Sequence, residues 1–402
     1  MSLAARFMKI AAVCTAALLS ACGGGGGGGG GGGPPVTDAG TLKVALTDGP
    51  ACGYSHIFLT VQKVRVNQSA TAADGDAGWS EIVLTPPQKI DLLSLTNGAV
   101  AELGSVLLPV GNYKQMSLVL DASTPLANSV VPFGASETPL ATPAGLQSGM
   151  KIPISIDVAS GQTSDYLLDV DACNSVLRLG QPATGYDLSL RYSVVQRLSA
   201  TVTGFVALSL DPLTTRVSLQ SAPLPGSVVP TIVRSTVPDS SGKFVLYPVP
   251  AGTYNLVISE PSRVVTLVTS VLVANSTSTT INTSAAPIDP PLGNPHTASG
   301  TVTTGTTPVD ARVVVIKRYL GGPDVVFAGA PADASTGALI YTVPAAAAIR
   351  ATNLLGSPLG FSNDTTSPSG LFTIAVTAGG TTKTMDVDAT SGNPVPVTFT
   401  FP

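Results

Sequence analysis

Residues 40–50 read Gly-Thr-Leu-Lys-Val-Ala-Leu-Thr-Asp-Gly-Pro, and this stretch decides the fold class. Leu42, Val44 and Leu46 alternate with Thr, Lys and Ala, and a period of two predicts a β-strand with one face on a core. The Asp-Gly-Pro that follows predicts a turn, because glycine and proline supply the backbone angles that turns require. The sequence therefore opens its folded part with a strand and a turn.

The same alternation recurs further along the chain. Apolar residues fall on odd positions in residues 57–61 and on even positions in residues 64–66, so a bulge or bend is predicted near Gln62-Lys63. Pro153 indicates that its strand lies at a sheet edge. One helix is predicted, at residues 92–107. Further strands are predicted at residues 116–120, 152–158, 168–170 and 188–194.

Composition agrees with this pattern. The 402 residues include 42 Gly and 33 Pro, a density that suits short strands with many turns and disfavours long helices. The length exceeds the roughly 100–200 residues of one domain. We therefore predict an all-β, multi-domain β-sandwich architecture with at most one short helix.

Charge and hydropathy exclude nucleic-acid binding and, after the N-terminal segment, a transmembrane helix. The chain carries 20 Lys and Arg against 24 Asp and Glu, and its densest basic pair is Lys317-Arg318. Nucleic-acid binding requires a clustered basic field, so the sequence excludes it. After the N-terminal segment no apolar run reaches the roughly 20 residues of a transmembrane helix.

The N-terminal segment resembles a bacterial lipoprotein signal peptide. A basic start (Arg6, Lys9) precedes an apolar run at residues 10–19, and Leu19-Ser20-Ala21-Cys22 resembles a lipobox. The resemblance implies a diacylglyceryl group on the Cys22 sulfur, cleavage before Cys22 and acylation of the new amine. More than one acyl chain holds a protein stably at a membrane. The membrane is therefore a predicted partner, contacted through the N-terminal lipid. An ordinary signal peptide with an incidental cysteine is the alternative.

Eleven glycines at residues 23–33 follow this cysteine, and Pro34-Pro35 follow them. Such a run predicts a flexible tether that spans about 20 Å on average. It is not a phosphate-binding loop, because no strand precedes it and no Lys-Ser/Thr pair follows it. Gly23 stands where an aspartate would suggest inner-membrane retention in Gram-negative cells. We therefore expect an outer-membrane anchor, with the protein facing the periplasm or the cell surface.

Two cysteines remain for the folded part. Cys14 leaves with the signal peptide and Cys22 carries lipid, which leaves Cys52 and Cys173 in an oxidising compartment. These two are predicted to form a disulfide. Two free thiols, or half of a metal site, are the alternatives.

Three ordered motifs resemble the DUF4382 family of bacterial lipoproteins over about residues 40–198. They are the opening stretch, residues 90–113 with Ile-Asp-Leu-Leu-Ser-Leu and Leu-Pro-Val-Gly-Asn-Tyr, and residues 166–171 with Tyr-Leu-Leu-Asp-Val-Asp. The resemblance implies no activity, because the family is functionally uncharacterised. The two remaining cysteines occupy positions that the family pattern does not require.

A second unit resembles the carboxypeptidase-regulatory-like, transthyretin-like β-sandwich. Residues 239–244 (Asp-Ser-Ser-Gly-Lys-Phe) lead to residues 249–256 (Val-Pro-Ala-Gly-Thr-Tyr-Asn-Leu). Gly242 supplies a turn, and the Tyr254 hydroxyl is expected to form a hydrogen bond at a sandwich edge. The resemblance implies a spacer or a folding aid.

The C-terminal region restarts the strand pattern after a Pro-rich linker and is interpreted as a degenerate repeat of the second unit. Two places compete for the repeated turn, residues 333–344 and residues 369–379; we favour the second, because Phe372 follows its glycine as Phe244 does. The predicted segments are residues 1–21 (signal peptide), 22–39 (lipidated Cys and tether), 40–198 (DUF4382-like domain), 199–284 (second sandwich), 285–296 (linker) and 297–402 (C-terminal β domain).

Catalytic and metal-binding patterns are weak. His56 and His296 fall in different predicted segments, and no HExxH, Walker or GxSxG pattern occurs, so we predict no catalytic residue, metal ligand or cofactor. Three aspartate pairs are interpreted as solvated strand faces or loops, although paired carboxylates also serve glycosidases and calcium sites. These pairs are Asp169 with Asp171, Asp386 with Asp388, and Asp74 with Asp76.

Two residues are candidates for ligand contact. Asp48 is expected to form a hydrogen bond within its own turn, and ligand contact is the alternative. Trp79, the sole tryptophan, follows the Asp74 loop and could present a ring to a sugar; a core position is the alternative.

We therefore predict a lipid-anchored cell-envelope protein that acts as a non-enzymatic structural or binding module. A glycan- or peptide-binding surface lipoprotein is the first alternative, so a glycan or an envelope protein is a candidate partner. A carboxylate-dependent hydrolase of envelope polymers is the second. The sequence indicates no oligomeric state.

Overall fold

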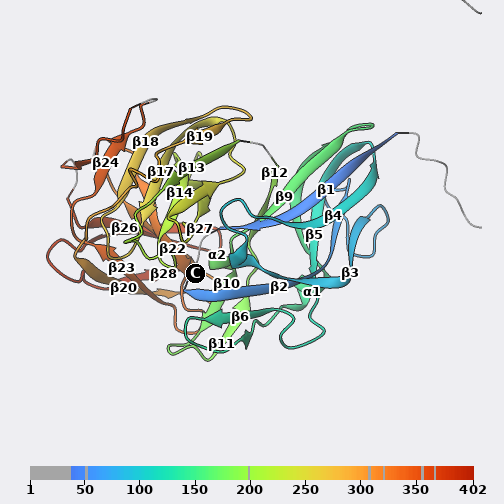
Figure 1. The fold of residues 1–402 in the computed structure, drawn as a ribbon. Helices are drawn as coiled ribbons and strands as arrows, with labels where there is room; N and C mark the ends of the chain where they lie inside the picture. The colour runs from blue at the N-terminus through green and yellow to red at the C-terminus, as the bar shows by residue number, and fades with distance from the viewer. Residues whose placement is uncertain are drawn as a thin grey trace, which may run out of the picture. The chain divides into compact units, whose positions relative to one another are not determined.

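The structure is a computed structural model that describes residues 38–402 apart from 50–52, 198–199, 307–308, 320–321, 355–356 and 366–367. Cys22, its glycine tether and Cys52 lie outside the described residues. Strands dominate the rest (Figure 1), which confirms the all-β fold class. The α-helices are Ala144–Ser148 (α1) and Ala172–Ser175 (α2), so the described part has two short helices instead of one. No helix there has the length and apolar character needed to cross a bilayer.

Seven strands form a first sandwich. In one sheet, β1 lies between β4, which is antiparallel to it, and β9, which is parallel to it. The other sheet has the order β3-β2-β5-β8, with antiparallel pairs throughout. The strands are β1 (Ala39–Asp48), β2 (Tyr54–Asn67), β3 (Ser80–Asp91), β4 (Ala101–Pro109), β5 (Gly111–Leu120), β8 (Met150–Val158) and β9 (Thr163–Val170).

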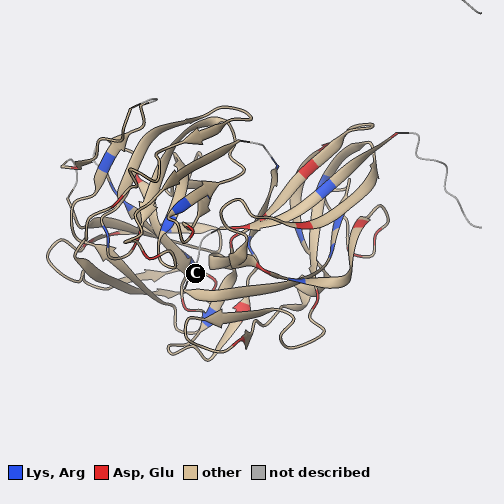
Figure 2. Cartoon of the chain, in the orientation of Figure 1, with Lys and Arg blue, Asp and Glu red and all other residues tan. Residues whose placement is uncertain are grey.

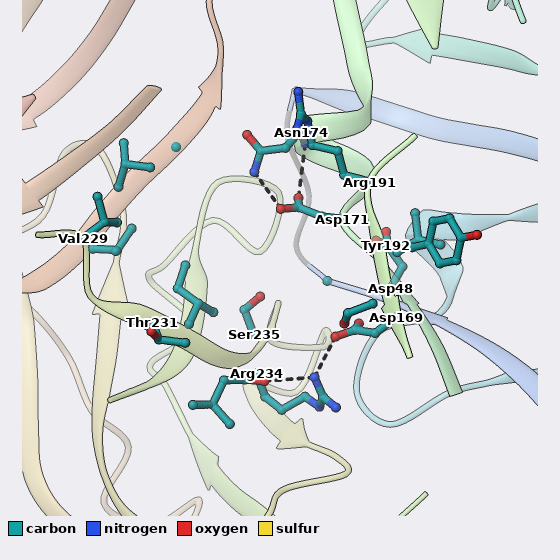
Figure 3. A pocket seen from close by; sticks show the side chains of 18 of the residues that line it. Asp48, Asp169, Asp171, Asn174, Arg191, Tyr192, Val229, Thr231, Arg234 and Ser235 are labelled. Atoms are coloured by element: carbon teal, nitrogen blue, oxygen red, sulfur yellow. Dashed lines mark hydrogen bonds and ion pairs between the residues drawn. The ribbon is translucent and has the colours of Figure 1, made fainter. Parts of the chain in front are cut away.

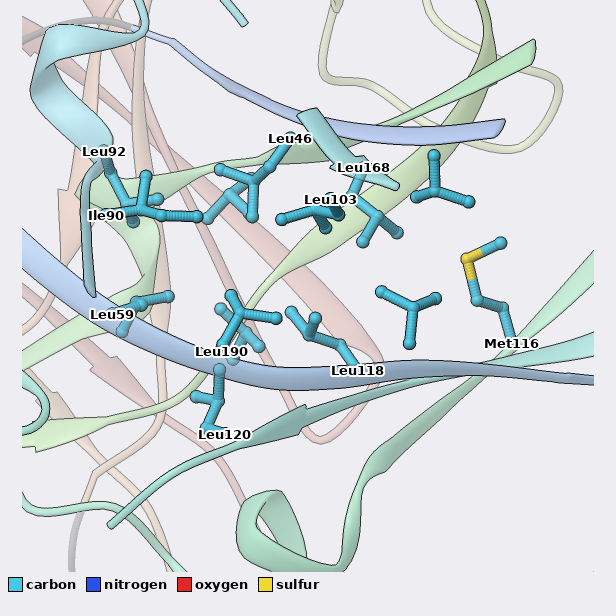
Figure 4. Packing of buried hydrophobic residues seen from close by; sticks show 14 of the residues in the cluster. Leu46, Leu59, Ile90, Leu92, Leu103, Met116, Leu118, Leu120, Leu168 and Leu190 are labelled. Atoms are coloured by element: carbon cyan, nitrogen blue, oxygen red, sulfur yellow. The ribbon is translucent and has the colours of Figure 1, made fainter. Parts of the chain in front are cut away.

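Apolar side chains from both sheets fill the space between them (Figure 4). Leu42 and Leu46 of β1 are fully buried, as the alternation in the sequence predicts, whereas Lys43 is exposed. The register of β2 shifts between Val61 and Lys63, which confirms the predicted bulge. The edge position predicted from Pro153 is also confirmed, because β5 is the only described strand with which β8 pairs.

Short elements are added to this sandwich. In the sheet that holds β2, β6 pairs with β2 and β7 pairs with β6; β12 pairs with β9; and β10 and β11 form a separate hairpin. The predicted strand at residues 188–194 is therefore divided between β11 and β12. The bounds are β6 (Ser129–Pro132), β7 (Thr138–Pro139), β10 (Val176–Leu179), β11 (Gly185–Leu188) and β12 (Tyr192–Gln196).

The same seven-strand topology recurs in a second sandwich. Its first strand, β13, lies between antiparallel β16 and parallel β19, and the other sheet contains the order β15-β14-β17-β18. One cluster of buried apolar residues, with Val202 and Phe244 fully buried, joins the two sheets. The strands are β13 (Thr201–Phe205), β14 (Arg216–Ser221), β15 (Thr231–Thr236), β16 (Lys243–Leu246), β17 (Gly252–Ser259), β18 (Thr266–Val273) and β19 (Ser278–Thr280).

A third sandwich has this topology again. Here β20 lies between antiparallel β23 and parallel β28, and the other sheet has the order β22-β21-β26-β27. The two strands β24 and β25 are inserted, and β24 pairs with β18 of the second sandwich. The bounds are β20 (Pro295–Thr303), β21 (Arg312–Lys317), β22 (Val325–Pro331), β23 (Ala338–Pro344), β24 (Ile349–Thr352), β25 (Ser362–Asn363), β26 (Leu371–Ala378), β27 (Thr381–Asp388) and β28 (Val397–Thr400). The domain boundaries given above stay predictions.

One turn is repeated in detail between the second and third sandwiches. Asp239 N–H donates to Lys243 O and Val206 N–H donates to Gly242 O; in the third sandwich Asp333 N–H donates to Ala338 O, and Val302 N–H donates to Gly337 O. The repeated turn therefore lies at residues 333–337, and our preference for residues 369–379 is wrong. Phe372 follows a glycine as Phe244 does, but Gly370 precedes β26, whereas the strand that corresponds to β16 is β23.

A second motif is shared by the first and second sandwiches. Pro-x-Gly-x-Tyr occurs at residues 109–113 and 250–254, where the fifth strand of each sandwich begins. The Tyr254 hydroxyl donates to Pro250 O at 2.9 Å, and the Tyr113 hydroxyl donates to Pro109 O at 3.2 Å. The hydrogen bond predicted for Tyr254 is thus present.

The helix predicted at residues 92–107 is wrong. Only Leu92–Ser94 forms a short 3-10 helix, and residues 101–109 form β4. Asn97 and Gly98 have positive φ angles of 55° and 81°, which an α-helix cannot accommodate. The leucines of this stretch match a helical spacing by coincidence, since they are divided between two elements.

We expect Gly337→Ala to destabilise the chain more than Gly379→Ala does. Both glycines have positive φ, 68° and 54°, so both substitutions carry the roughly 1–2 kcal/mol of a left-handed residue. A Cβ on Gly337 would also lie 1.9 Å from Val302 O, whereas nothing lies within 4 Å of a Cβ on Gly379. Gly337→Ala should therefore lower the free energy of unfolding by at least about 2 kcal/mol more, measured by urea denaturation. Equal losses would contradict the tight turn.

Candidate functional site

A pocket of about 460 Å³ lies where loops and strand ends of the three sandwiches meet. The first sandwich contributes the ends of β1 and β9, the second contributes β14 and β15, and the third contributes β21 and β22. Figure 3 shows Asp48, Asp169 and Asp171 on one side of this pocket, with Val229, Thr231 and Ser235 on the other. A volume of this size falls in the range of small-molecule sites.

Asp48 is the most deeply buried charged residue of the pocket, with 5% of its surface exposed. Its Oδ1 accepts a hydrogen bond from the Ala172 N–H at 3.0 Å. Its Oδ2 is buried and has no hydrogen-bond partner within the described residues. Burial raises the pKa of Asp48 well above its usual value, and nearby Asp171 and Asp169 raise it further, although the N–H groups of Ala172 and Gly49 lower it.

Asp169 is held by an ion pair. Its Oδ2 lies 2.6 Å from Nη1 of Arg234, a side chain that is only 10% exposed. Nε of Arg234 also donates to Pro248 O at 2.7 Å. Burial raises the pKa of Asp169, Arg234 lowers it, and Asp171 raises it. The pair joins β9 of the first sandwich to β15 of the second.

Asp171 is engaged locally. It is the N-cap of α2, where it accepts hydrogen bonds from the Asn174 N–H at 3.2 Å and from Asn174 Nδ2 at 2.7 Å. The prediction that Asp169 and Asp171 share one face of a strand is wrong, because β9 ends at Val170. The two side chains nevertheless line the same pocket (Figure 3).

Two arginines of the pocket have no such partner. Arg216 begins β14 and Arg312 begins β21, and neither makes an ion pair or a side-chain hydrogen bond with any residue that the structure describes. Nε of Arg216 is buried. Burial lowers the pKa of Arg216, Asp171 raises it, Arg312 lowers it and Asp48 raises it. The two guanidinium groups therefore repel each other.

Trp79 does not lie at this pocket. Its half-buried ring stacks under the Arg65 guanidinium at 4.4 Å, and its Nε1 donates to Ala73 O at 2.8 Å. These contacts fix the Asp74 loop, in which Asp74 pairs with Lys151 at 2.7 Å. Trp79 therefore has a structural explanation that requires no sugar.

The other candidates are also engaged in local contacts. His56 lies 2.7 Å from Asp91, and His296 Nδ1 lies 2.6 Å from Ala389 O. Asp386 accepts from the Thr373 hydroxyl and Asp388 accepts from the Thr390 N–H. Within the described ranges no group of three or more His, Cys, Asp or Glu residues could hold a metal ion.

The predicted disulfide remains a prediction, because Cys52 lies outside the described residues. Cys173 is buried in α2, directly after Ala172, which donates to Asp48. The site therefore adjoins one of the two cysteines.

Sequence reasoning found the acidic half of the pocket and missed the basic half. Asp48 and the Asp169 pair were singled out, but no signal in the sequence joins Arg216, Arg234 and Arg312, which are far apart along the chain. Basic and acidic residues are interspersed along the strands (Figure 2), so no charge run marks the pocket.

Residues 39–189 match the model of a family described as a domain of unknown function, DUF4382. This match confirms the first of the two family resemblances, over less than half of the chain. The transthyretin-like resemblance of residues 199–284 stays a prediction. No curated protein matches the chain.

Several solved structures share limited similarity. A type II cohesin–X-dockerin complex from Acetivibrio cellulolyticus is 25% identical over 24% of this chain, with a TM-score of 0.18, and this chain covers 59% of that one. A Streptococcal ancillary pilin is 10% identical over 90% of this chain and 98% of its own, with a TM-score of 0.18. The major pilin subunit of Bacillus cereus is 12% identical over 90% and 99%, with a TM-score of 0.15. At these TM-scores the similarities support no conclusion about this chain.

We expect Asp48→Asn to raise the melting temperature at pH 7. The folded pKa of Asp48 lies above the unfolded value, so between these two pKa values the folded state binds more protons than the unfolded state. The stability of the wild-type protein therefore falls as pH rises through that range. Asparagine does not titrate, so the difference in melting temperature between the variant and the wild type should shrink as pH is lowered toward 4. Thermal unfolding at several pH values measures it. The exposed Asp38→Asn is the control, and a constant difference at all pH values would contradict the expectation.

Proposed function

We propose that the chain is a lipid-anchored, non-enzymatic structural module of the cell envelope. The observation that carries the proposal is that the three sandwiches share buried polar contacts and paired strands, so that they act as one unit. Residues 38–402 group together as a single compact unit. A module of this kind keeps its surfaces in a fixed arrangement.

The first and second sandwiches are joined by two sets of contacts. One is the ion pair between Asp169 and Arg234. In the other, Asn97 Oδ1 accepts from the Val245 N–H at 2.8 Å, and the Asn97 N–H donates to the Thr236 hydroxyl at 2.9 Å. Both sets of contacts satisfy charged or hydrogen-bonding groups, which would lose their partners if the two sandwiches separated and water did not replace them.

The second and third sandwiches are joined through Gln220, which is 1% exposed. Its Nε2 donates to Val326 O at 2.8 Å, and its Oε1 accepts from the Val326 N–H at 2.7 Å. The amide thus pairs with the edge of β22 as another strand would. The pairing of β24 with β18 adds a continuous sheet between the same two parts.

The first and third sandwiches also meet. Arg178 and the Gly180 N–H contact Asp333, at 3.6 Å and 3.3 Å, and Asp333 organises the repeated turn through Ser335 and Thr336. Arg191 pairs with Asp310. Each sandwich therefore contacts both others, which supports a single rigid module.

The lipid anchor rests on the lipobox resemblance of residues 19–22. An acylated Cys22 with eleven glycines behind it would hold the module at the outer membrane while leaving it free to reorient. This arrangement suits a protein that acts at the envelope and not in the cytoplasm.

We expect Arg234→Met to destabilise the module by about 2–3 kcal/mol, because it leaves the carboxylate of Asp169 without its cation. Arg318→Met is the matched control, since the Arg318 side chain is 49% exposed and its pair with Asp324 should contribute only about 0–1 kcal/mol.

Calorimetry also reports the cooperativity of unfolding. If wild type unfolds in three independent transitions, the structural proposal is wrong.

We expect Cys22→Ser to abolish labelling of the chain by radioactive palmitate and to move it from the membrane fraction to the soluble fraction. Cys14→Ser is the control, because Cys14 precedes the predicted cleavage point and should leave the labelling intact. Labelled Cys22→Ser protein would refute the anchor without touching the structural proposal.

A further inference from the structure

The pocket contains charged side chains with buried polar atoms that no described residue satisfies. Oδ2 of Asp48 and Nε of Arg216 are both buried, and neither has a hydrogen-bond partner in the described part of the chain. An unmade hydrogen bond on a buried polar atom costs about 1–3 kcal/mol, and more for a charged group. Both atoms belong to residues that line the same pocket.

The remaining charges of the pocket are already used. Asp169 pairs with Arg234, Arg191 pairs with Asp310, and Asp171 caps α2. What is left is one carboxyl group whose Oδ2 has no hydrogen-bond partner, and two arginines that make no ion pair, among the described residues. This combination is unlike a simple interface, where opposite charges would pair with each other.

We propose that this pocket binds a small carboxylate that also carries hydrogen-bond donors, with the carboxylate on Arg216 and Arg312 and a hydroxyl or ammonium donor on the carboxyl group of Asp48. Planar guanidinium groups match a carboxylate in charge and geometry. Sugar acids and amino acids share this chemistry.

The charge of the pocket favours a monoanion over a dianion. Arg191 and Arg234 pair with Asp310 and Asp169, which leaves Arg216 and Arg312 together with Asp48 and Asp171. A phosphate dianion would lie close to these two carboxyl groups, and a single carboxylate brings less negative charge to them.

The shape of the pocket favours a ligand the size of one sugar or amino acid. Its volume of about 460 Å³ lies toward the small end of the range for ligand sites. Val229 and Ile232 supply an apolar wall and Thr231 supplies a hydroxyl group, whereas the Tyr192 hydroxyl already donates to Met150 O. A ring or short chain with one polar end and one apolar face fits these walls.

Calorimetric titration of the purified full chain in detergent tests the proposal with matched probes. D-glucuronate and D-glucose differ in the carboxylate, as do L-alanine and ethylamine. We expect either glucuronate or alanine to bind at one site. The one that binds should do so at least tenfold more tightly than its matched compound without the carboxylate, glucose or ethylamine. The carboxylate that binds identifies the source as a sugar acid or an amino acid.

Three variants locate the binding. Arg312 is exposed, so Arg312→Gln should weaken binding at least tenfold without affecting folding. Arg216→Gln and Asp48→Asn should also weaken binding at least tenfold. Arg318→Gln is the control and should bind as wild type does. Thermal unfolding of each variant shows whether it is folded.

Several results would overturn the proposal. These are no binding of either carboxylate up to about 10 mM, equal binding of each pair, tighter binding of inorganic phosphate, or full binding by folded Arg312→Gln protein. The proposal adds a binding role to the structural module, and it fails separately from that module, because calorimetric cooperativity and palmitate labelling do not depend on the ligand.

Discussion

The parallel pairing of the first strand with the last is the constraint from which the rest of the structure follows. In each sandwich the first strand also pairs with the fourth, so it lies inside its sheet and its backbone groups are satisfied on both sides. In the first sandwich this pairing aligns Thr47 with Asp169 and Asp48 with Val170. Asp48 and Asp169, which are more than 120 positions apart in the sequence, therefore bring their carboxyl groups to the same end of the sheet, where the pocket lies.

Placing charge at that end opposes stability. Burial disfavours the ionised form of Asp48 and the charged form of Arg216. The Ala172 N–H and the carboxyl group of Asp171 offset this effect only in part, and Asp48 Oδ2 and Arg216 Nε have no hydrogen-bond partner among the described residues. Unsatisfied charges that persist in an otherwise well-packed chain are more readily explained by function than by folding, because functional sites are where stability is commonly sacrificed.

The strands could be predicted from the sequence because their signals are local. Alternation identified β1 and the bulge in β2, Pro153 identified the edge position of β8, and a Gly-containing turn identified the second sandwich. The helix at residues 92–107 was wrong because apolar spacing alone does not reveal the break at Asn97 and Gly98. The pocket could be predicted only in part, because its arginines lie on different sandwiches and converge only through the tertiary arrangement. The threefold topology was hidden for a similar reason, since insertions such as β6–β7 and β24–β25 interrupt the sequence period.

The proposed structural role and the proposed binding role depend on the same contacts. Arg234 joins the first and second sandwiches at the pocket wall, and Arg312 reaches the pocket from the third. A ligand that contacts Asp48, Arg216 and Arg312 would therefore touch all three sandwiches at once. Because a ligand stabilises the state to which it binds, occupancy of this pocket would strengthen the contacts that hold the module together. Conversely, the contacts outside the pocket, such as Gln220 with Val326, keep Arg216 and Arg312 in place before a ligand arrives.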